Sequence, residues 1–357
     1  MSDSITRPDD PVLDQLCGQL SATAGELDIA GDWARQQLQL LGQAGVYRWF
    51  LPHEWGGFDW TEEALASGYM KLAAACLTTA FVLTQRSAAV RRIVESDNQT
   101  AKQRLLPALA DGSLFATVGI SHLTTSRRHL AKPVLQARET ADGFVLNGYS
   151  PWVTGAAHAD IVVLGATMDD GQQVLLALPT SLSGVVVPSH AKLLGLNSSH
   201  TGPLECHEVH VGNDALLDGP VENVIAARSG TKTGGLQTSA LAIGLSAAAI
   251  SFLDNESKKR IELRAPTESL RSEHDVCEAD LLALAAGAPA CSSEDLRARA
   301  NSLALRATQA ALAAAKGAGY VAGHPAGRWC REALFFLVWS CPQPVMNANL
   351  CELAGLG

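Results

Sequence analysis

Three consecutive residues, Trp152, Val153 and Thr154, place a flat apolar ring and a hydroxyl on one short β-prone run. Side chains two apart on a strand point to the same face, so the Trp152 indole and the Thr154 hydroxyl share one side. That pairing suits a flat heteroaromatic cofactor, which would stack on the ring and hydrogen-bond to the hydroxyl. The alternative is a hairpin whose tryptophan fills a core.

Two turn signals precede this run. Asp142-Gly143 and Asn147-Gly148 each supply a glycine that tolerates a positive φ, so each predicts a tight hairpin turn. Residues before the stretch follow a helical pattern, and residues after it follow a strand pattern. The run that contains Trp152 therefore lies near the entry to a β-rich module.

The chain divides into three segments by the period of its apolar residues. Residues 1–113 have the helical period, residues 114–228 form short strand-like runs, and residues 229–357 are helical again. The runs of the middle segment are 115–120, 134–140, 144–146, 152–154, 161–164, 174–178, 184–187 and 204–211. They predict a compact antiparallel sandwich or barrel, and therefore an α+β fold. In the first segment, Asp59 followed by Glu62 predicts the N-cap of a helix.

Composition and charge argue against several classes of function. Of the 357 residues, 47% are hydrophobic and 18% are charged, which is typical of a globular protein with an extensive core. The formal net charge of −9 argues against a nucleic-acid surface, because phosphate binding needs concentrated positive charge. No apolar run reaches the roughly 18 residues of a membrane helix, and residues 1–11 lack the pattern of a signal peptide. We therefore expect a cytoplasmic protein without nucleic-acid or membrane partners.

Common metal and cofactor motifs are missing from the sequence. The eight cysteines form no Cys-x-x-Cys pair and no histidine pair has zinc spacing, so we expect free thiols and no metal site. There is no Gly-x-Gly-x-x-Gly after a strand, no P-loop and no Gly-x-Ser-x-Gly. The usual dinucleotide, nucleotide and hydrolase chemistries are thus not indicated.

Four short motifs occur in a fixed order around this helix–sheet–helix layout. They are Leu51-Pro52-His53-Glu54-Trp55-Gly56-Gly57, the stretch Gly143–Thr154, residues 192–196 with 204–211, and Gly317-Ala318-Gly319-Tyr320 followed by Pro325, Arg328 and Arg331-Glu332-Ala333. In this order they resemble the acyl-CoA dehydrogenase superfamily over nearly the whole chain. The resemblance implies an N-terminal α-helical domain, a middle β-barrel or sandwich domain and a C-terminal four-helix bundle.

The resemblance also implies FAD, held between the β-domain and the C-terminal bundle, and an acyl-CoA or related thioester as substrate. In that family a carboxylate takes an α-proton while hydride leaves the β-carbon for flavin N5. The cofactor carries the hydride, and the protein supplies orientation, a base and polarising hydrogen bonds. The family further implies a homodimer or homotetramer, with a paralogous partner subunit as an alternative.

The resemblance assigns roles to individual residues. Trp152, Val153 and Thr154 match the flavin-facing strand, in which Trp152 covers the ring and Thr154 hydrogen-bonds to it. The remaining cofactor candidates are Ser121 and Ser126, which stand for two hydroxyls of the loop after the first strand, and Arg260, Gly317 and Gly319, which match parts of the pyrophosphate site. The substrate-side candidates are His122 and Arg127, from a positive patch in the loop 120–129, and Cys341, from the loop nearest the acyl group.

The catalytic base is the main departure from the family pattern. Aligning Arg331-Glu332-Ala333 with the family's Arg-Asp-Ala places Ser340 where the catalytic glutamate stands. A serine hydroxyl takes no α-proton at neutral pH without a base of its own. The alternative carboxylate of some relatives falls on Gln237, whose amide is not a base. The identity of the catalytic residues is therefore open.

Three functions remain open from the sequence. The first is a flavin-dependent oxidoreductase that acts on an acyl-CoA or related thioester, with the usual glutamate replaced. The second is a same-fold flavin monooxygenase or oxidase, which needs no carboxylate and for which Ser121, His122, His129 and Cys341 are candidate contacts. The third is a catalytically degenerate scaffold or partner subunit that no longer binds FAD, because the pyrophosphate motifs are eroded.

Overall fold

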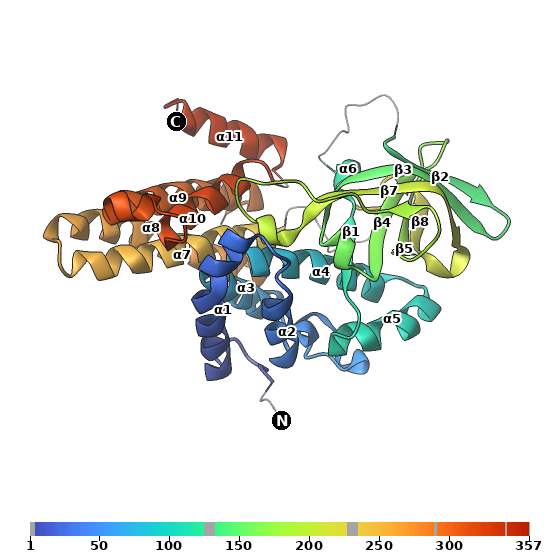
Figure 1. Ribbon diagram of the computed structural model, residues 1–357, viewed down its shortest axis with the longest axis horizontal. Coiled ribbons are helices and arrows are strands. Elements are labelled where there is room, and N and C mark those ends of the chain that lie inside the picture. The colour runs from blue at the N-terminus through green and yellow to red at the C-terminus, as the bar shows by residue number, and fades with distance from the viewer. Residues whose placement is uncertain (1–3, 125–132, 227–234, 289–290, 340, 357) are drawn as a thin grey trace.

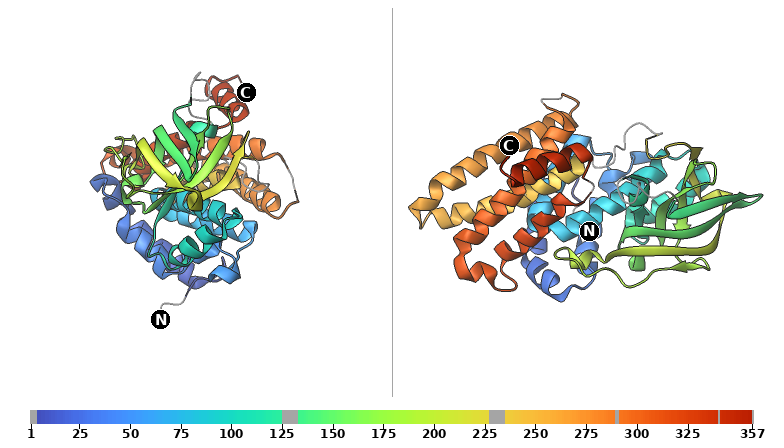
Figure 2. Two further views of the ribbon diagram at one scale, coloured as in Figure 1. Left: turned by 90° about the vertical axis from the view of Figure 1, so that its right-hand side faces the viewer. Right: turned by 90° about the horizontal axis from the view of Figure 1, so that it is seen from above.

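The fold has three parts that follow one another along the chain and pack together (Figure 1). The computed structural model describes residues 4–124, 133–226, 235–288, 291–339 and 341–356. Helices form the first part, a β-sheet the second and helices again the third. Figure 2 shows the sheet at one end of the molecule and the C-terminal helices at the other. The predicted order of helices, strands and helices is confirmed.

The first part consists of helices, and one of them contacts both other parts. The helices are α1 (Pro11–Ala30), α2 (Arg35–Gln43), α3 (Glu62–Ala75), α4 (Leu77–Glu95) and α5 (Gln99–Asp111). Helix α4 is buried along most of its length, because its side chains are apolar or small on nearly every side. It packs against α3, against the first strand of the sheet and against the first helix of the third part. This helix therefore forms part of the junction of all three parts.

Helix α3 begins at a different residue from the one predicted. Thr61 is the N-cap, and its hydroxyl accepts a hydrogen bond from the Ala64 amide at 3.2 Å. The prediction that Asp59 caps this helix is wrong, because Asp59 lies before it with a φ of 49°. The chain is still turning back there, and Asp59 N donates to Leu51 O at 3.0 Å. Gly57 permits this return, since a Cβ at that position would lie 1.7 Å from Leu51 O.

The second part is one mixed β-sheet. Its strands are β1 (Ala116–Gly119), β2 (Leu135–Thr140), β3 (Gly143–Thr154), β4 (Ile161–Thr167), β5 (Gln173–Pro179), β6 (Val185–Val186), β7 (Thr201–Gly212) and β8 (Leu216–Val221). The strand order is β6-β7-β3-β2-β4-β5-β8, and β1 pairs with β4. Strand β4 runs parallel to both β1 and β2, so the expectation of a purely antiparallel module is wrong. A short helix, α6 (Ser121–Thr124), follows β1.

Strand β3 is longer than predicted, because one of the two turn signals is not a turn. Asp142-Gly143 does begin a hairpin return, in which Thr140 pairs with Gly143. The prediction of a turn at Asn147-Gly148 is wrong, because both residues lie inside β3, where its pairing with β7 shifts in register. Gly148 has a φ of 119°, and a Cβ there would lie 2.1 Å from Val134 O. The glycine therefore serves a β-bulge, which bends the strand without ending it.

The third part again consists of helices. They are α7 (Leu236–Ser257), α8 (Arg264–Ala285), α9 (Ser293–Ala315), α10 (Pro325–Ala333) and α11 (Gln343–Leu353). Helix α7 is long and apolar enough to cross a membrane, with a mean hydropathy of 1.6, so the expectation that no apolar run has this length is wrong. However, 61% of its apolar window is buried inside the protein, as in a core helix. Gly244 lets α7 approach α3 closely, because a Cβ there would lie 2.3 Å from Met70 O.

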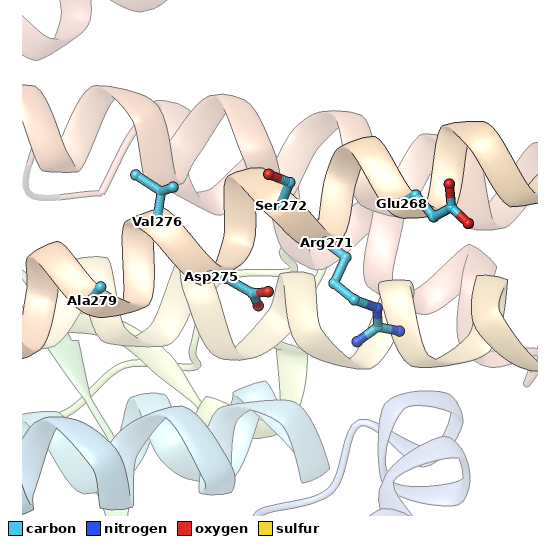
Figure 3. A pocket seen from close by; sticks show the side chains of 6 residues that line it. All are labelled: Glu268, Arg271, Ser272, Asp275, Val276 and Ala279. Carbon is cyan, nitrogen blue, oxygen red and sulfur yellow. The ribbon is translucent and has the colours of Figure 1, made fainter.

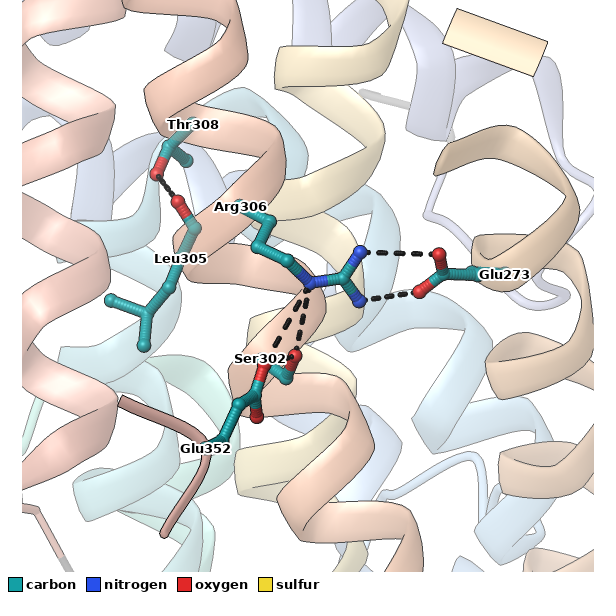
Figure 4. Close-up of polar contacts among 6 residues, drawn as sticks. All are labelled: Glu273, Ser302, Leu305, Arg306, Thr308 and Glu352. Carbon is teal, nitrogen blue, oxygen red and sulfur yellow. Dashed lines mark hydrogen bonds and ion pairs between the residues drawn. The ribbon is translucent and has the colours of Figure 1, made fainter. Parts of the chain in front are cut away.

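Polar contacts fasten the last helix to this bundle (Figure 4). Ser302 and Arg306 of α9 both face Glu352 of α11, and the Ser302 hydroxyl donates to the Glu352 carboxylate. Arg306 Nε lies 3.9 Å from the same carboxylate. The terminal nitrogens of Arg306 donate to Glu273 of α8. One arginine therefore joins three helices.

The main apolar core is shared by all three parts. It includes Leu83 of α4, Val163 of β4 and Leu303 of α9, none of which has exposed surface. A second, smaller core lies within the β-sheet part around Leu146 and Leu176. The three parts therefore pack on one another through the main core, and side chains from all three meet at their junction.

Candidate active site

A large cavity lies at the junction of the three parts. Its volume is about 1460 Å³. The lining side chains that matter below are Glu62, Phe81, Arg91 and Arg92 from the first part, Ser121, Trp152, Leu194 and Thr201 from the second, and Gln237, Leu241, Leu284, Glu294, Arg297, Arg331, Phe335, Trp339 and Val345 from the third. Ligand pockets commonly measure about 300–1,000 Å³, so this cavity has room for more than one small molecule.

Trp152 forms part of the cavity wall, and its contact with a cofactor stays a prediction. Its side chain is 40% exposed although its strand neighbours are buried. The pairing of β3 with β7 shifts between Ser150 and Val153, which marks a bulge at Trp152. A bulge changes the direction of a side chain, and here the indole is exposed at the cavity. Val153 is fully buried in the sheet core and does not line the cavity.

Thr154 is not among the residues that line the cavity. Its hydroxyl is buried and lies 2.9 Å from the hydroxyl of Thr201, its partner on β7. Thr201 also lies 2.9 Å from the Ser199 hydroxyl, and Thr201 does line the cavity. Thr201 is therefore the member of this hydrogen-bonded pair that lines the cavity. Sequence reasoning missed Thr201 because only strand pairing brings it to this place.

After β1, one predicted site residue faces the cavity and the next one faces the sheet. Ser121, the first residue of α6, lines the cavity. His122 does not, because its ring is buried against β4 with Nε2 at 2.8 Å from Gly165 O. Burial lowers the pKa of His122 to about 4, against the effect of that hydrogen bond. Ser126 and Arg127 lie outside the described residues, so their roles stay predictions.

The predicted pyrophosphate residues lie together, but away from the cavity. Arg260 Nη2 donates to Ala314 O and to the Glu256 carboxylate, each at 2.8 Å. This joins the region after α7 to the end of α9, next to the turn Lys316–Tyr320 that contains Gly317 and Gly319. None of the three predicted residues lines the cavity. Their assignment to a cofactor phosphate stays a prediction.

The candidate base positions lie at the edge of the third part. Gln237, in the first turn of α7, lines the cavity. Ser340 lies outside the described residues, so the replacement of the family glutamate by serine stays a prediction. Cys341 is half-buried, and its Sγ accepts a long hydrogen bond of 3.9 Å from Asn349. Burial raises the pKa of the Cys341 thiol, against the effect of Arg297, so the thiol stays protonated at neutral pH.

Charged side chains in the cavity wall were missed from the sequence. Arg91 pairs with Glu62 at 2.6 Å, and Arg331 pairs with Asp28 of α1. Arg297 of α9 is only 2% exposed. The sequence did contain a signal for Arg297. It lies on the same helix face as the small residues Ala300, Ala304, Ala307 and Ala311, and a charge on a buried helix face needs a partner.

A second, smaller hollow lies on the outer face of α8 (Figure 3). It has a volume of about 450 Å³ and is lined by residues of this one helix, among them Glu268, Arg271 and Asp275. One side-chain ligand atom of Asp275 also lies within 4.8 Å of those of His274 and Glu278. This hollow shares no lining residue with the large cavity.

The fold and the cavity together define a class of protein. Helical parts and a mixed sheet enclose a mainly apolar cavity with a few polar groups, which is the usual form of an enzyme or small-molecule site. Residues 12–113 match the family model described as the N-terminal domain of acyl-CoA dehydrogenase.

Individual relatives agree with this match. The chain is 23% identical to probable acyl-CoA dehydrogenase YngJ of Bacillus subtilis (strain 168), over 71% of this chain and 68% of that protein. It is 27% identical to dibenzothiophene monooxygenase of Rhodococcus erythropolis, over 57% of this chain and 50% of that protein. The structure of butyryl-CoA dehydrogenase from Megasphaera elsdenii superposes with a TM-score of 0.80 at 19% identity, covering 99% of this chain and 100% of that one.

Residues 12–113 belong to the N-terminal domain family of acyl-CoA dehydrogenases, and the chain as a whole has the fold of that superfamily. Its fold is the one the resemblance implied, with N-terminal helices, a middle β-sheet and C-terminal helices. Proteins of this superfamily bind FAD, and its members include both acyl-CoA dehydrogenases and flavin monooxygenases. The relatives thus include more than one kind of flavin enzyme, so they leave the reaction and the substrate of this chain open.

The described residues that line the cavity are of the kinds that suit the ring of a flavin. A flat heteroaromatic ring needs a flat apolar wall and hydrogen-bonding groups at its edge. Trp152 supplies the wall, and the hydroxyl-bearing residues Thr201 and Ser121 line the same cavity. Arg260 does not fit a phosphate in this cavity, because it lies elsewhere and is committed to Glu256 and Ala314.

Proposed function

We propose that this chain is an FAD-dependent oxidoreductase that acts on an acyl-CoA or a related thioester in the large cavity. The observation that carries the proposal is the exposed Trp152 indole, in a cavity walled by all three parts and otherwise rich in apolar side chains. When bound, FAD would accept the hydride that leaves the substrate.

The protein's own residues have three tasks in this proposal. Trp152 stacks on the ring, and Thr201 and Ser121 hydrogen-bond to its edge. Apolar side chains such as Phe81, Phe335 and Leu241 hold the acyl chain and exclude water from it. Exclusion of water strengthens the hydrogen bonds that orient the thioester carbonyl.

We further propose that Glu294 takes the substrate proton. Of the carboxylates that line the described part of the cavity, Glu62 is held in an ion pair with Arg91. Glu294, near the start of α9, accepts a 3.1 Å hydrogen bond from the neighbouring Ser293 hydroxyl and forms no ion pair with any residue that the structure describes. A carboxylate is a suitable base for an α-proton, whereas the Gln237 amide is not.

The Glu294→Gln variant tests this assignment. Loss of a general base typically lowers turnover by about 10²–10⁴-fold, so kcat for acyl-CoA dehydrogenation should fall by that order while the flavin spectrum stays unchanged. Asp295→Asn is the matched control, because Asp295 is adjacent on the helix but pairs with Arg299 and does not line the cavity. Equal kcat in both variants would rule Glu294 out as the base.

The absorption spectrum of the purified protein tests the function itself. We expect a bound-flavin spectrum in the blue, and bleaching of that band when an acyl-CoA substrate is added under anaerobic conditions. A colourless protein that binds no added FAD would contradict the proposal and favour the scaffold alternative.

An oxygen-using flavin enzyme is the second candidate. It is favoured by the identity of 27% to dibenzothiophene monooxygenase and by the paired state of Glu62. Chemical reduction of the flavoprotein followed by mixing with air separates the two candidates. Fast reoxidation with a hydroxylated product would support the monooxygenase, while slow reoxidation and acyl-CoA bleaching would support the dehydrogenase.

Assembly and location are part of the same proposal. We propose a homodimer or homotetramer in the cytoplasm, with a paralogous subunit as the alternative partner. The exposed apolar side chains Tyr320, Val321 and Val338 are suited to burial against another subunit. Sedimentation analysis of the purified chain and fractionation of the source cells are the direct measurements.

A further inference from the structure

Arg297 is an arginine held in place by neutral groups inside the cavity wall. Its Nε donates to the Asn301 side chain at 2.9 Å, and its Nη2 donates to Trp339 O at 3.1 Å. Asn301 is itself fixed by donating to Phe336 O at 3.1 Å. Among the described residues, nothing accepts a hydrogen bond from Nη1 of Arg297. One edge of the guanidinium is therefore fixed while the remaining nitrogen is unsatisfied.

Arg297 differs from the other cations of the cavity wall. Arg91 forms an ion pair with Glu62, and Arg331 forms one with Asp28. Burial lowers the pKa of Arg92, and the carboxylates of Glu95 and Asp218 oppose that effect. In the described part of the chain, no ion pair joins Arg297 to a carboxylate. Glu294, one turn earlier on α9, lines the same cavity but is hydrogen-bonded to Ser293.

Arg297 keeps its positive charge although its side chain is buried. Burial lowers the pKa of Arg297 to about 10, and the Cys341 side chain acts in the opposite direction. The guanidinium is therefore still protonated at neutral pH. A buried charge without an opposite charge is destabilising, so a ligand that brings a negative charge would gain affinity there.

We propose that Arg297 is a carboxylate-binding subsite of the large cavity, specific for a ligand that carries one negative charge on an apolar chain. A single uncompensated cation is matched by a monoanion, whereas a phosphate dianion would leave charge uncompensated in an apolar environment. Leu284, Trp339 and Val345, which line the same cavity, suit the apolar chain. If the cavity acts on an acyl thioester, the substrate is one whose acyl group ends in a second carboxylate; this last step rests on the proposed function.

Calorimetric titration with three small probes tests the subsite on the full chain as purified. The probes are octanoate, the uncharged octanamide and inorganic phosphate. We expect octanoate to bind at least about tenfold more tightly than octanamide, because a charge-assisted hydrogen bond in a dry site commonly contributes that much. We expect no binding of phosphate in the cavity.

Variants connect the effect to Arg297. Arg297→Met should remove the preference for octanoate over octanamide, and Arg297→Lys should retain part of it. Arg299→Met is the matched control, since Arg299 is on the same helix but pairs with Asp280 and Asp295 and does not line the cavity. Circular dichroism checks that each variant is folded. If Arg297→Met does not fold, Arg297→Lys is compared with the unmodified chain instead.

The outcomes decide the proposal without reference to turnover. An octanoate preference that persists in Arg297→Met, equal binding of octanoate and octanamide by the unmodified chain, or phosphate binding lost only in Arg297→Met would each overturn it. Flavin content is measured on the same samples. A flavin-free protein that still binds octanoate through Arg297 would support the subsite while contradicting the proposed oxidoreductase.

Discussion

The bulge at Trp152 determines which side chain of β3 is exposed at the cavity. Its neighbours Val153 and Thr154 are buried, and the pairing shift between β3 and β7 makes the indole the exposed member. The sequence predicted the strand and the tryptophan from local alternation. It could not predict that Thr201, and not Thr154, would line the cavity, because the pairing brings in a residue 47 positions away.

Replacement of Trp152 tests its role at the flavin ring. Trp152→Ala should weaken FAD binding by about tenfold, because stacking and apolar burial of the ring are lost. Trp152→Phe keeps an aromatic face and should retain most of the affinity. The measurement is flavin fluorescence quenching during titration of the flavin-free protein. Unchanged affinity in Trp152→Ala would place the flavin elsewhere.

Glu332 makes the stability of the folded chain depend on pH, and a single substitution should remove that dependence. Its carboxylate is buried 3.7 Å from Arg328, and Glu332 Oε2 and Arg328 Nε have no hydrogen-bond partner in the described residues. Burial raises the pKa of Glu332 to about 7, against the effect of Arg328. Between pH 4.5 and about 7 the folded chain thus holds a proton that the unfolded chain has released. Stability contributed by Glu332 is therefore lost as pH rises through this range.

The expected slope is about 1.4 kcal/mol per pH unit in the free energy of unfolding. Glu332→Gln should reduce the fall in stability between pH 5 and about 7, measured by urea unfolding at several pH values. Glu268→Gln on the exposed face of α8 is the control and should keep the wild-type slope. An unaltered slope in Glu332→Gln would mean that the carboxylate is charged in the folded protein throughout this range.

At the scale of elements, a histidine cluster joins the α1–α2 turn to the sheet. His158 lies 2.9 Å from His200, and His200 Nε2 donates to Gly31 O at 3.0 Å. Neutral His200 therefore accepts at Nδ1, and His158 Nε2 donates to it. Trp33 stacks on His158, and His190 stacks on His200. This arrangement requires a neutral His200, because a protonated His200 has no ring nitrogen left to accept the hydrogen bond from His158.

Acidification should loosen this joint. Burial lowers the pKa of His158 to about 4, with His200, Arg35 and His190 acting in the same direction. Burial also lowers the pKa of His200. Between pH 6.5 and about 4 the unfolded chain therefore binds protons that the folded chain does not, and stability falls as pH falls.

Hydrogen exchange by mass spectrometry measures this loosening directly. We expect faster exchange at the α1–α2 turn at pH 5 than at pH 7.5, after correction for the intrinsic pH effect. In His158→Gln, which can donate to His200 without titrating, the difference should shrink. Equal protection at both pH values in the unmodified chain would refute the assignment.

Element boundaries were predictable where the signal is local. The glycine after α5, Gly112, ends that helix in the left-handed region, as a glycine at the end of a helical pattern commonly does. Asn147-Gly148 has the same local signature as a hairpin, yet the chain continues through it. The difference comes from β7, which pairs on both sides of the bulge, and no local pattern contains that partner.

At the scale of the molecule, side-chain contacts tie the first part to the sheet. Ser96 Oγ, between α4 and α5, donates to Leu217 O of β8 at 2.6 Å. Asn98 Nδ2 donates to Leu216 O at 2.9 Å, and Arg104 pairs with Asp214 at 2.7 Å. Together with the shared core, these contacts predict cooperative unfolding of the three parts.

Ser96→Ala tests this coupling. The buried Leu217 carbonyl would lose its donor, so the free energy of unfolding should fall by about 1–3 kcal/mol. Unfolding followed by circular dichroism and by tryptophan fluorescence should remain one coincident transition. Ser113→Ala, an exposed serine, is the control. Separated transitions in Ser96→Ala would show that the first part and the sheet unfold independently.

The arrangement of the whole molecule was the most predictable feature, and the site the least. Segment order and helix positions follow from periodicity, which is a property of neighbouring residues. The cavity wall combines Trp152, Arg297 and Phe81 from three separate parts. Which side chains meet there depends on long-range packing, so the sequence indicated the tryptophan but not the arginine.

The division of the cavity wall among three parts has a thermodynamic consequence for any occupant. An unfolded chain brings none of these wall segments together, so a ligand of the cavity binds the native state alone. By mass action such a ligand raises the free energy of unfolding by about 2.7 kcal/mol at a concentration 100 times its Kd. Melting temperature therefore reports cavity occupancy without an assay of turnover, and a panel of acyl thioesters can be ranked by the rise that each produces.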